Sequence, residues 1–144
     1  MKCFVSYGDF CAIYTGEIEK LIDLCQKHGV ILKEKLCPTC GEQCRIDFKK
    51  LSFRCDKTYV TRGHRRKKCS FKRTISKGTW FDNVKVDVET NLKFIVLFVQ
   101  DWFSYKVAIS ELKLTNATVN DWSSFCREVF ISWVLHHTKE NWRP

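Results

Sequence analysis

The residues of this 144-residue sequence with the clearest chemistry are its nine cysteines, five of which lie within the stretch 37–78. Cys-Pro-Thr-Cys at 37–40, followed by glycine, has the spacing of a zinc knuckle, a tight turn that aims two thiolates at one point. A tetrahedral site needs two further ligands, which two downstream cysteines supply. We therefore predict one structural zinc ion, bound by Cys37, Cys40, Cys55 and Cys69.

Two other residues compete for places in this ligand set. Cys44 follows Cys40 by four residues, where a turn and the start of a strand would point it away from the metal. His64 lies in RGHRRKK, where like charge disfavours a neutral imidazole ligand and favours a phosphate contact. Either could still replace a predicted ligand. Four thiolates would close the coordination shell, so the predicted zinc stabilises a fold rather than performing catalysis.

Reduced cysteines are favoured over disulfides. The count of nine is odd, and the N-terminal segment has Asp9 inside its apolar part and no small-residue cleavage site, so we predict no secretory signal. The most apolar run, residues 94–99, is closed off by Gln100 and Asp101, which predicts no membrane span.

The positive charge is concentrated around the cysteines. Residues 31–80 contain 15 Lys and Arg against 4 Asp and Glu, whereas the rest of the chain contains 10 against 12. A patch of one sign is typical of phosphate binding, although a solvated basic loop is the plainer alternative. The candidate phosphate contacts in this stretch are Arg62, His64, Arg65, Arg66, Lys67, Lys68, Lys72, Arg73 and Lys77.

The elements that would position these residues are short. Ile18, Leu21, Ile22 and Cys25 form one helical stripe, with Thr15 or Gly16 as the cap and Gly29 as the stop. Alternating apolar residues predict two strands, around 46–48 and 51–55, and a third segment carries Cys69 after a long basic loop. The first fifteen residues show no reliable period.

The C-terminal part predicts three helices. The first is a long apolar helix from Val88 to Phe103 capped by Asp87, and the second is a short helix capped by Ser104. The third is capped by Thr115 and has the apolar stripe Val119, Trp122, Cys126, Val129 and Trp133.

This layout favours a helix-turn-helix, although Lys113 stands where the turn often has glycine. Asp121 and Glu128 would repel phosphate, and a bundle that merely packs is the alternative. The residues that we expect on the DNA-facing side of the third helix are Asn116, Asn120, Ser123, Ser124 and Arg127.

We thus predict a small α+β protein with one N-terminal helix. Its expected parts are an N-terminal helical segment (1–30), a zinc ribbon of short antiparallel strands with a basic loop (31–78) and a helix-turn-helix bundle (79–144).

The ordered combination of KHGVI, CPTCG, FRC, TISKGTWF, the hydrophobic helix with Trp102 and LTNATVNDWSSFCREVF resembles the N-terminal region of Merlin-type DDE transposases. These are related to bacterial insertion-sequence transposases that carry a zinc ribbon and a helix-turn-helix ahead of the catalytic domain. The resemblance covers about residues 16–135 and implies recognition of transposon-end DNA. In the family, catalysis belongs to a later RNase-H-like domain, and this sequence ends at Pro144 before such a domain. We therefore expect no catalytic residue here; Asp82, Asp87 and Asp101 are expected to be caps and surface groups.

The resulting expectation is a transposase-derived, zinc-dependent protein that binds double-stranded DNA and is not an enzyme. Two alternatives remain open: the N-terminal part of an active DDE transposase, and a protein-interaction adaptor with a structural zinc. A homodimer is one form it could take. The expected location is nuclear in a eukaryote and cytoplasmic otherwise.

Overall fold

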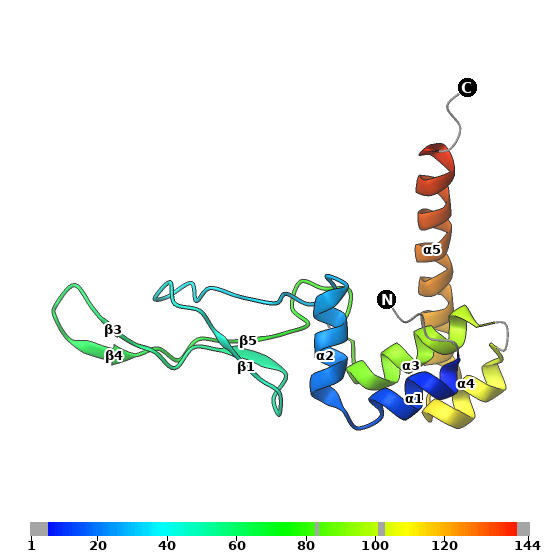
Figure 1. Cartoon of the computed structure of the whole chain (residues 1–144), viewed down its shortest axis with the longest axis horizontal. Helices are drawn as coiled ribbons and strands as arrows, with labels where there is room; N and C mark the ends of the chain where they lie inside the picture. The colour runs from blue at the N-terminus through cyan, green and yellow to red at the C-terminus, as the bar shows by residue number, and fades with distance from the viewer. Residues whose placement is uncertain (1–5, 83, 101–102, 141–144) are drawn as a thin grey trace. The chain divides into compact units, whose positions relative to one another are not determined.

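The computed structural model describes residues 6–82, 84–100 and 103–140, with side chains up to residue 138 (Figure 1). These residues form five α-helices and two small antiparallel sheets, and the strands precede the last three helices, which confirms the predicted α+β class. The chain divides into two compact units. We call Gly16–Val88 the strand unit and Met1–Thr15 with Glu89–Pro144 the helical unit, so the predicted segment 1–30 is divided between them.

The strand unit begins with α2 (Ile18–Lys27), whose predicted stripe is confirmed because Leu21, Ile22 and Cys25 are buried. The helix ends as expected at Gly29, which has a positive φ of 70°. There the backbone N–H of Val30 donates to the Cys25 carbonyl at 2.8 Å. The predicted start is wrong by one or two residues: the N-cap is Glu17, with no side-chain capping bond.

Five short strands follow. The first sheet has the order β1-β2-β5, from β1 (Arg45–Asp47), β2 (Ser52–Arg54) and β5 (Lys72–Thr74), and the second pairs β3 (Thr58–Val60) with β4 (Arg66–Lys68). The pairing continues without a shift from the first sheet to the second: Phe53 pairs with Arg73, and Tyr59, six residues later, pairs with Lys67, six residues earlier. The segment from β2 to β5 is therefore one long hairpin, which we call the basic hairpin.

The tip of the basic hairpin is a three-residue loop. The backbone N–H of Thr61 donates to Arg65 O at 3.0 Å, and that of His64 donates to Thr61 O at 2.8 Å. His64 has a φ of 56°, the left-handed conformation that commonly closes such a loop. The segment predicted to be a basic loop therefore contains two strands and a defined turn, which corrects the prediction.

The helical unit contains a helix that the sequence analysis missed, α1 (Tyr7–Tyr14), so two helices precede the strands instead of one. It is capped by Ser6, whose hydroxyl accepts the backbone N–H of Asp9 at 3.1 Å. The backbone N–H of Tyr7 donates to Gln100 Oε1 at 3.0 Å, which joins α1 to the residue that follows α3 (Val88–Val99). Helix α1 is short and apolar on most sides, so it carries no helical period to detect.

The core of the helical unit lies among α3 (Val88–Val99), α4 (Tyr105–Leu112) and α5 (Asn116–Glu140). The predicted end of the first of these helices at Phe103 is wrong, because α3 ends at Val99; Asp101 and Trp102 lie outside the described residues. The buried core side chains are Phe94, Leu97, Ala108, Leu112 and Val119.

A three-residue turn connects α4 to α5. Lys113 adopts the left-handed conformation, with φ 54° and ψ 34°, so the turn has the shape that favours glycine although it carries lysine. Thr115 caps α5 as predicted, since its hydroxyl accepts the Thr118 backbone N–H at 3.2 Å. Ser104 occupies the N-cap position of α4 but makes no side-chain capping bond.

The apolar stripe of α5 is only half buried. Val119 is fully buried, and Trp122 and Cys126 pack against the core, whereas Val129 and Trp133 are exposed, so only the first half of the predicted stripe is covered. Among the described residues, no helix has both the length and the apolar character needed to cross a membrane.

Candidate metal centre and nucleic-acid interface

Four cysteine sulfurs meet in the strand unit, and they are the four predicted from the sequence. The sulfur atoms of Cys37, Cys40, Cys55 and Cys69 all lie within 4.8 Å of one another. Cys37 Sγ lies 3.4 Å from Cys69 Sγ, and Cys40 Sγ lies 3.4 Å from Cys55 Sγ. Tetrahedral zinc with Zn–S distances of about 2.3 Å requires sulfurs about 3.8 Å apart, so this cluster has the size of a metal site.

The first two sulfurs come from a tight turn. The backbone N–H of Cys37 donates to Glu42 O at 2.8 Å and that of Gly41 donates to Cys37 O at 2.9 Å. Gly41 has a φ of 75°, which a residue with a side chain adopts only under strain. The glycine after the second cysteine therefore lets the chain reverse while both sulfurs point to one place.

The other two sulfurs come from the two strands of the basic hairpin. The backbone N–H of Cys55 donates to Phe71 O at 3.0 Å, and that of Cys69 donates to Lys57 O at 2.7 Å. Directly paired residues share a face of a hairpin, and so do residues two apart on one strand. Cys55 and Cys69 therefore lie diagonally on the same face, which explains how residues 14 positions apart reach one site.

Backbone amides surround the cluster. Burial alone would raise the pKa of Cys37, but hydrogen bonds to its sulfur from the N–H groups of Cys40 and Thr39 and from the thiols of Cys69 and Cys40 together outweigh burial and lower the pKa to about 6. Each of the other sulfurs also receives one amide N–H that lowers its pKa, although burial and the neighbouring cysteines outweigh it and raise the pKa: Glu42 to Cys40, Lys57 to Cys55 and Phe71 to Cys69. Donors aimed at all four sulfurs stabilise thiolates, the form that binds a metal ion.

The competing ligands lie outside the cluster. Cys44 is buried beside it, where burial and then the four neighbouring cysteines raise its pKa, but its sulfur is not among the clustered atoms. His64 is at the exposed tip of the basic hairpin. Cys25, in α2, has its pKa raised to about 11 by burial, as expected for a packed thiol.

The basic hairpin extends beyond the metal cluster and is exposed and cationic. All nine candidate phosphate contacts between Arg62 and Lys77 are exposed. Lys77 forms a salt bridge with Asp82 at 3.1 Å, whereas no salt bridge within the described residues includes the other cations of this set. No acidic residue occurs between Asp56 and Asp82. The sequence analysis omitted Lys57, an exposed cation that only the hairpin register places beside Cys69.

A second candidate surface lies on the N-terminal half of α5. At 100° per residue, Asn116, Asn120, Ser124 and Arg127 fall on one side of the helix, and all four are exposed. Arg127 donates to Ser124 Oγ at 3.4 Å. Ser123 was also expected on this side, but its side chain is fully buried, which corrects that prediction.

No protein-family model, curated protein or solved structure matches the chain. The transposase resemblance therefore remains a prediction from the quoted motifs.

Proposed function

We propose that this chain is a zinc-stabilised module that binds double-stranded DNA, and that the strand unit is a zinc ribbon whose basic hairpin contacts the phosphate backbone. The observation that carries the proposal is the exposed cationic hairpin held beyond four clustered cysteines, with no acid between Asp56 and Asp82. A cation without a nearby carboxylate is available to replace condensed counterions on DNA.

Zinc would be bound by Cys37, Cys40, Cys55 and Cys69, because four sulfurs with amide donors suit a soft thiolate site. Its role would be to tie the knuckle turn to both strands of the hairpin, with no coordination position left for substrate.

The helical unit supplies a second contact in this proposal. Helix α4, the three-residue turn and α5 would act as a helix-turn-helix, with α5 as the recognition helix and its polar stripe toward base edges and phosphates: Asn116, Asn120, Ser124 and Arg127. Asp121 and Glu128, which are also exposed on α5, limit how closely that helix can approach phosphate. Together with the quoted motifs, this supports an origin in the DNA-binding region of a transposase.

The test is the salt dependence of duplex binding, measured by fluorescence anisotropy on the zinc-loaded protein. Each phosphate contact contributes about −0.9 to the slope of log K against log salt. Replacing Arg65, Arg66, Lys67 and Lys68 by alanine should therefore reduce the magnitude of the slope by about 3 to 4.

A matched control removes the same charge elsewhere in the strand unit: the alanine variant of Lys33, Lys49, Lys50 and Lys85, all exposed. We expect this variant to change the slope by less than about 1. Equal effects of the two variants would mean that net charge alone acts, and unchanged binding by the hairpin variant would favour the adaptor alternative.

A further inference from the structure

The C-terminal half of α5 carries large apolar side chains that stay exposed in the described part of the chain. The exposed fractions are 52% for Val129, 62% for Phe130, 56% for Ile131, 56% for Trp133 and 54% for Leu135. A helix that is apolar on every side is normally buried. This segment therefore has the composition of a contact surface.

The pattern of these residues indicates what kind of element would cover them. The core stripe of α5 repeats with alternating steps of three and four, and the same repeat continues past the core. Its buried and partly buried members are Val119, Trp122 and Cys126, and its exposed members are Val129, Trp133 and His136. A 3.5-residue repeat is the pattern by which one helix packs along another. The expected cover is thus a helix.

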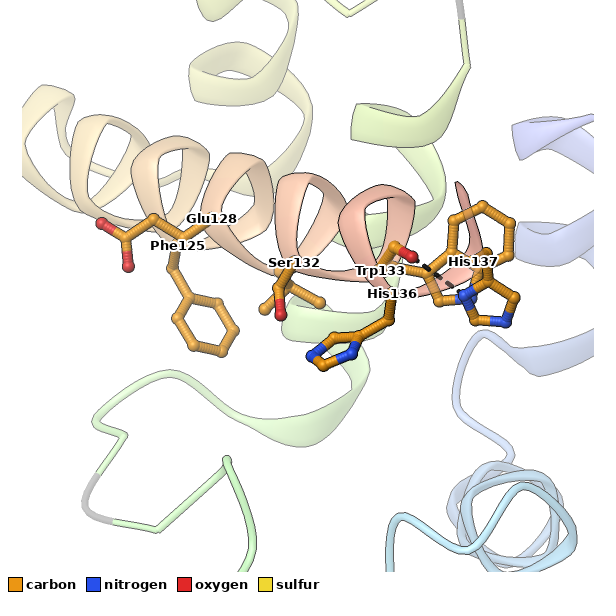
Figure 2. Close-up of a pocket in the computed structure, with 7 residues that line it drawn as sticks. Phe125, Glu128, Ser132, Trp133, His136 and His137 are labelled. Atoms are coloured by element: carbon orange, nitrogen blue, oxygen red, sulfur yellow. Dashed lines mark hydrogen bonds between the residues drawn. The ribbon is translucent and has the colours of Figure 1, made fainter. Parts of the chain in front are cut away.

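The exposed part of the repeat borders a shallow groove of about 500 Å3, lined by Phe125, Glu128, Val129, Ser132, Trp133, His136 and His137. Figure 2 shows Phe125, Ser132 and His136 projecting from the same side of α5. His137 is held in place, since its ring stacks on Trp133 at 4.1 Å and its Nδ1 lies 2.8 Å from Trp133 O.

The charge along the groove favours a particular arrangement. Glu128 lies one turn before Ser132, and His136 lies one turn after it. If two such segments pair in antiparallel orientation, the carboxylate end of each faces the histidine end of the other. Parallel pairing would place Glu128 against Glu128, which is unfavourable.

We infer that the C-terminal half of α5 is a self-association surface on which a second copy of this chain packs antiparallel, with the two-fold axis near Ser132. Such an isologous interface uses the same groove on both copies and closes after two. It goes beyond the proposed DNA contact and does not depend on it, because the polar stripe of Asn116 and Arg127 lies on the opposite side of α5.

The available area sets the expected strength. Taking about 200 Å2 for a whole aromatic side chain, the groove residues Phe125, Val129 and Trp133 expose roughly 300 Å2 per copy. Two copies with their polar neighbours then bury on the order of 1,000 Å2, which is near the lower limit for a specific interface. The dissociation constant is accordingly expected on the order of micromolar.

The experiment is sedimentation velocity of the zinc-loaded full chain, without DNA, over a concentration range of about 1 to 100 µM. We expect a reversible monomer–dimer equilibrium in the wild type. Trp133→Glu should weaken it by at least about 30-fold, because an aromatic anchor is lost and a charge is placed in the interface. Phe130→Glu is the matched control, since Phe130 has a similar exposed fraction, does not line the groove and, at 100° per residue, points away from Ser132.

A charge exchange tests the orientation. Glu128→Lys should weaken the dimer, and adding His136→Glu should restore it, because only antiparallel pairing places these two positions opposite each other. A monomer throughout the concentration range would overturn the inference and leave a different protein as the occupant. Equal loss in the Trp133 and Phe130 variants would overturn the groove as the contact, and absence of rescue would overturn the antiparallel arrangement.

Discussion

Replacing Cys55 by serine should weaken metal binding and destabilise the strand unit while leaving the helical unit folded. Cys55 contributes one of the four clustered sulfurs and belongs to the hairpin, whereas Cys44 is buried close by but outside the cluster. The pair Cys55→Ser and Cys44→Ser therefore compares the same chemical change inside and outside the predicted ligand set.

The expected loss can be estimated in two ways. Structural zinc binds such sites with an apparent binding free energy of about 10–16 kcal/mol. One ligand of four then corresponds to about 3 to 4 kcal/mol, or roughly a 100- to 1,000-fold loss of zinc affinity. The cluster also joins Cys37 to Cys69 across 32 residues. Cross-linking a loop of that length is worth about 4 kcal/mol of chain entropy.

A loss of this size is decisive for the strand unit because its core is small. Its largest fully buried side chains are Leu21, Ile22 and Ile31, joined by Phe53 and Phe81 at a few per cent exposed. Domains of this size usually need a metal or disulfides in addition to their hydrophobic core. At about 4 to 8 °C per kcal/mol, removal of one ligand should lower the melting temperature of this unit by about 15 to 30 °C.

The assay combines zinc stoichiometry by native mass spectrometry with amide hydrogen exchange. In Cys55→Ser we expect zinc occupancy in the presence of a competing chelator and protection in β1 to β5 to fall, with unchanged protection in α3 to α5. Cys44→Ser should keep one zinc per chain and cost only about 1 to 2 kcal/mol for the buried hydroxyl. Retention of zinc by Cys55→Ser together with its loss from Cys44→Ser would refute the ligand set, and full folding of the wild type in chelator would refute the metal centre.

Three further tests, two of them with a matched variant, address individual parts of the structure. Lys113→Gly should stabilise the helical unit by about 1 kcal/mol in urea unfolding, because the turn residue is left-handed, whereas Lys106→Gly inside α4 should cost about as much. Asp47 accepts hydrogen bonds from Arg54 Nη1 and from the Lys50 backbone N–H, both at 3.1 Å, so Asp47→Ala should cost about 2 kcal/mol and Asp47→Asn, which keeps an acceptor oxygen, about 1; equal costs would show that the retained acceptor oxygen contributes nothing. His64→Gly should preserve the hairpin tip, as measured by exchange of its amides, yet reduce DNA affinity by about 2- to 10-fold; unchanged affinity would exclude a phosphate contact by the imidazole.

The metal cluster could be predicted from the sequence because its chemistry is local. The C-x-x-C-G spacing defines a turn by itself, and Cys55 follows a segment with clear alternation. The helix that contains Leu21 and Cys25 was likewise predictable, since its stripe repeats at helical spacing. Each of these signals is contained within a few consecutive residues.

The basic hairpin could not be predicted in the same way because β3 and β4 have no buried face. The β4 residues Arg66, Lys67 and Lys68 are all exposed, so hydrophobic alternation is absent and the segment resembles a loop. Its strands are defined by pairing across the hairpin and by the two cysteines at its base, which are long-range features. Ser123 was misplaced for a related reason: the side of α5 that faces the core depends on its packing against α3 and α4.

The arrangement couples metal binding to the proposed DNA contact. Cys55 and Cys69 lie on the two strands that lead to the cationic tip, so loss of the metal frees the ends of the segment that carries Arg62 to Lys68. Those cations would then have to be ordered again on DNA, and ordering costs about 1 kcal/mol or more for each backbone residue. Chelation should therefore weaken duplex binding while the number of cations stays the same. The slope of log K against log salt for the residual binding should then be that expected for the same number of cations on a flexible segment.

By contrast, the contact surface on α5 belongs to the helical unit, which has its own core, so self-association should survive chelation. Measuring duplex affinity and sedimentation with and without chelator separates the two properties, and a loss of both together would contradict their independence.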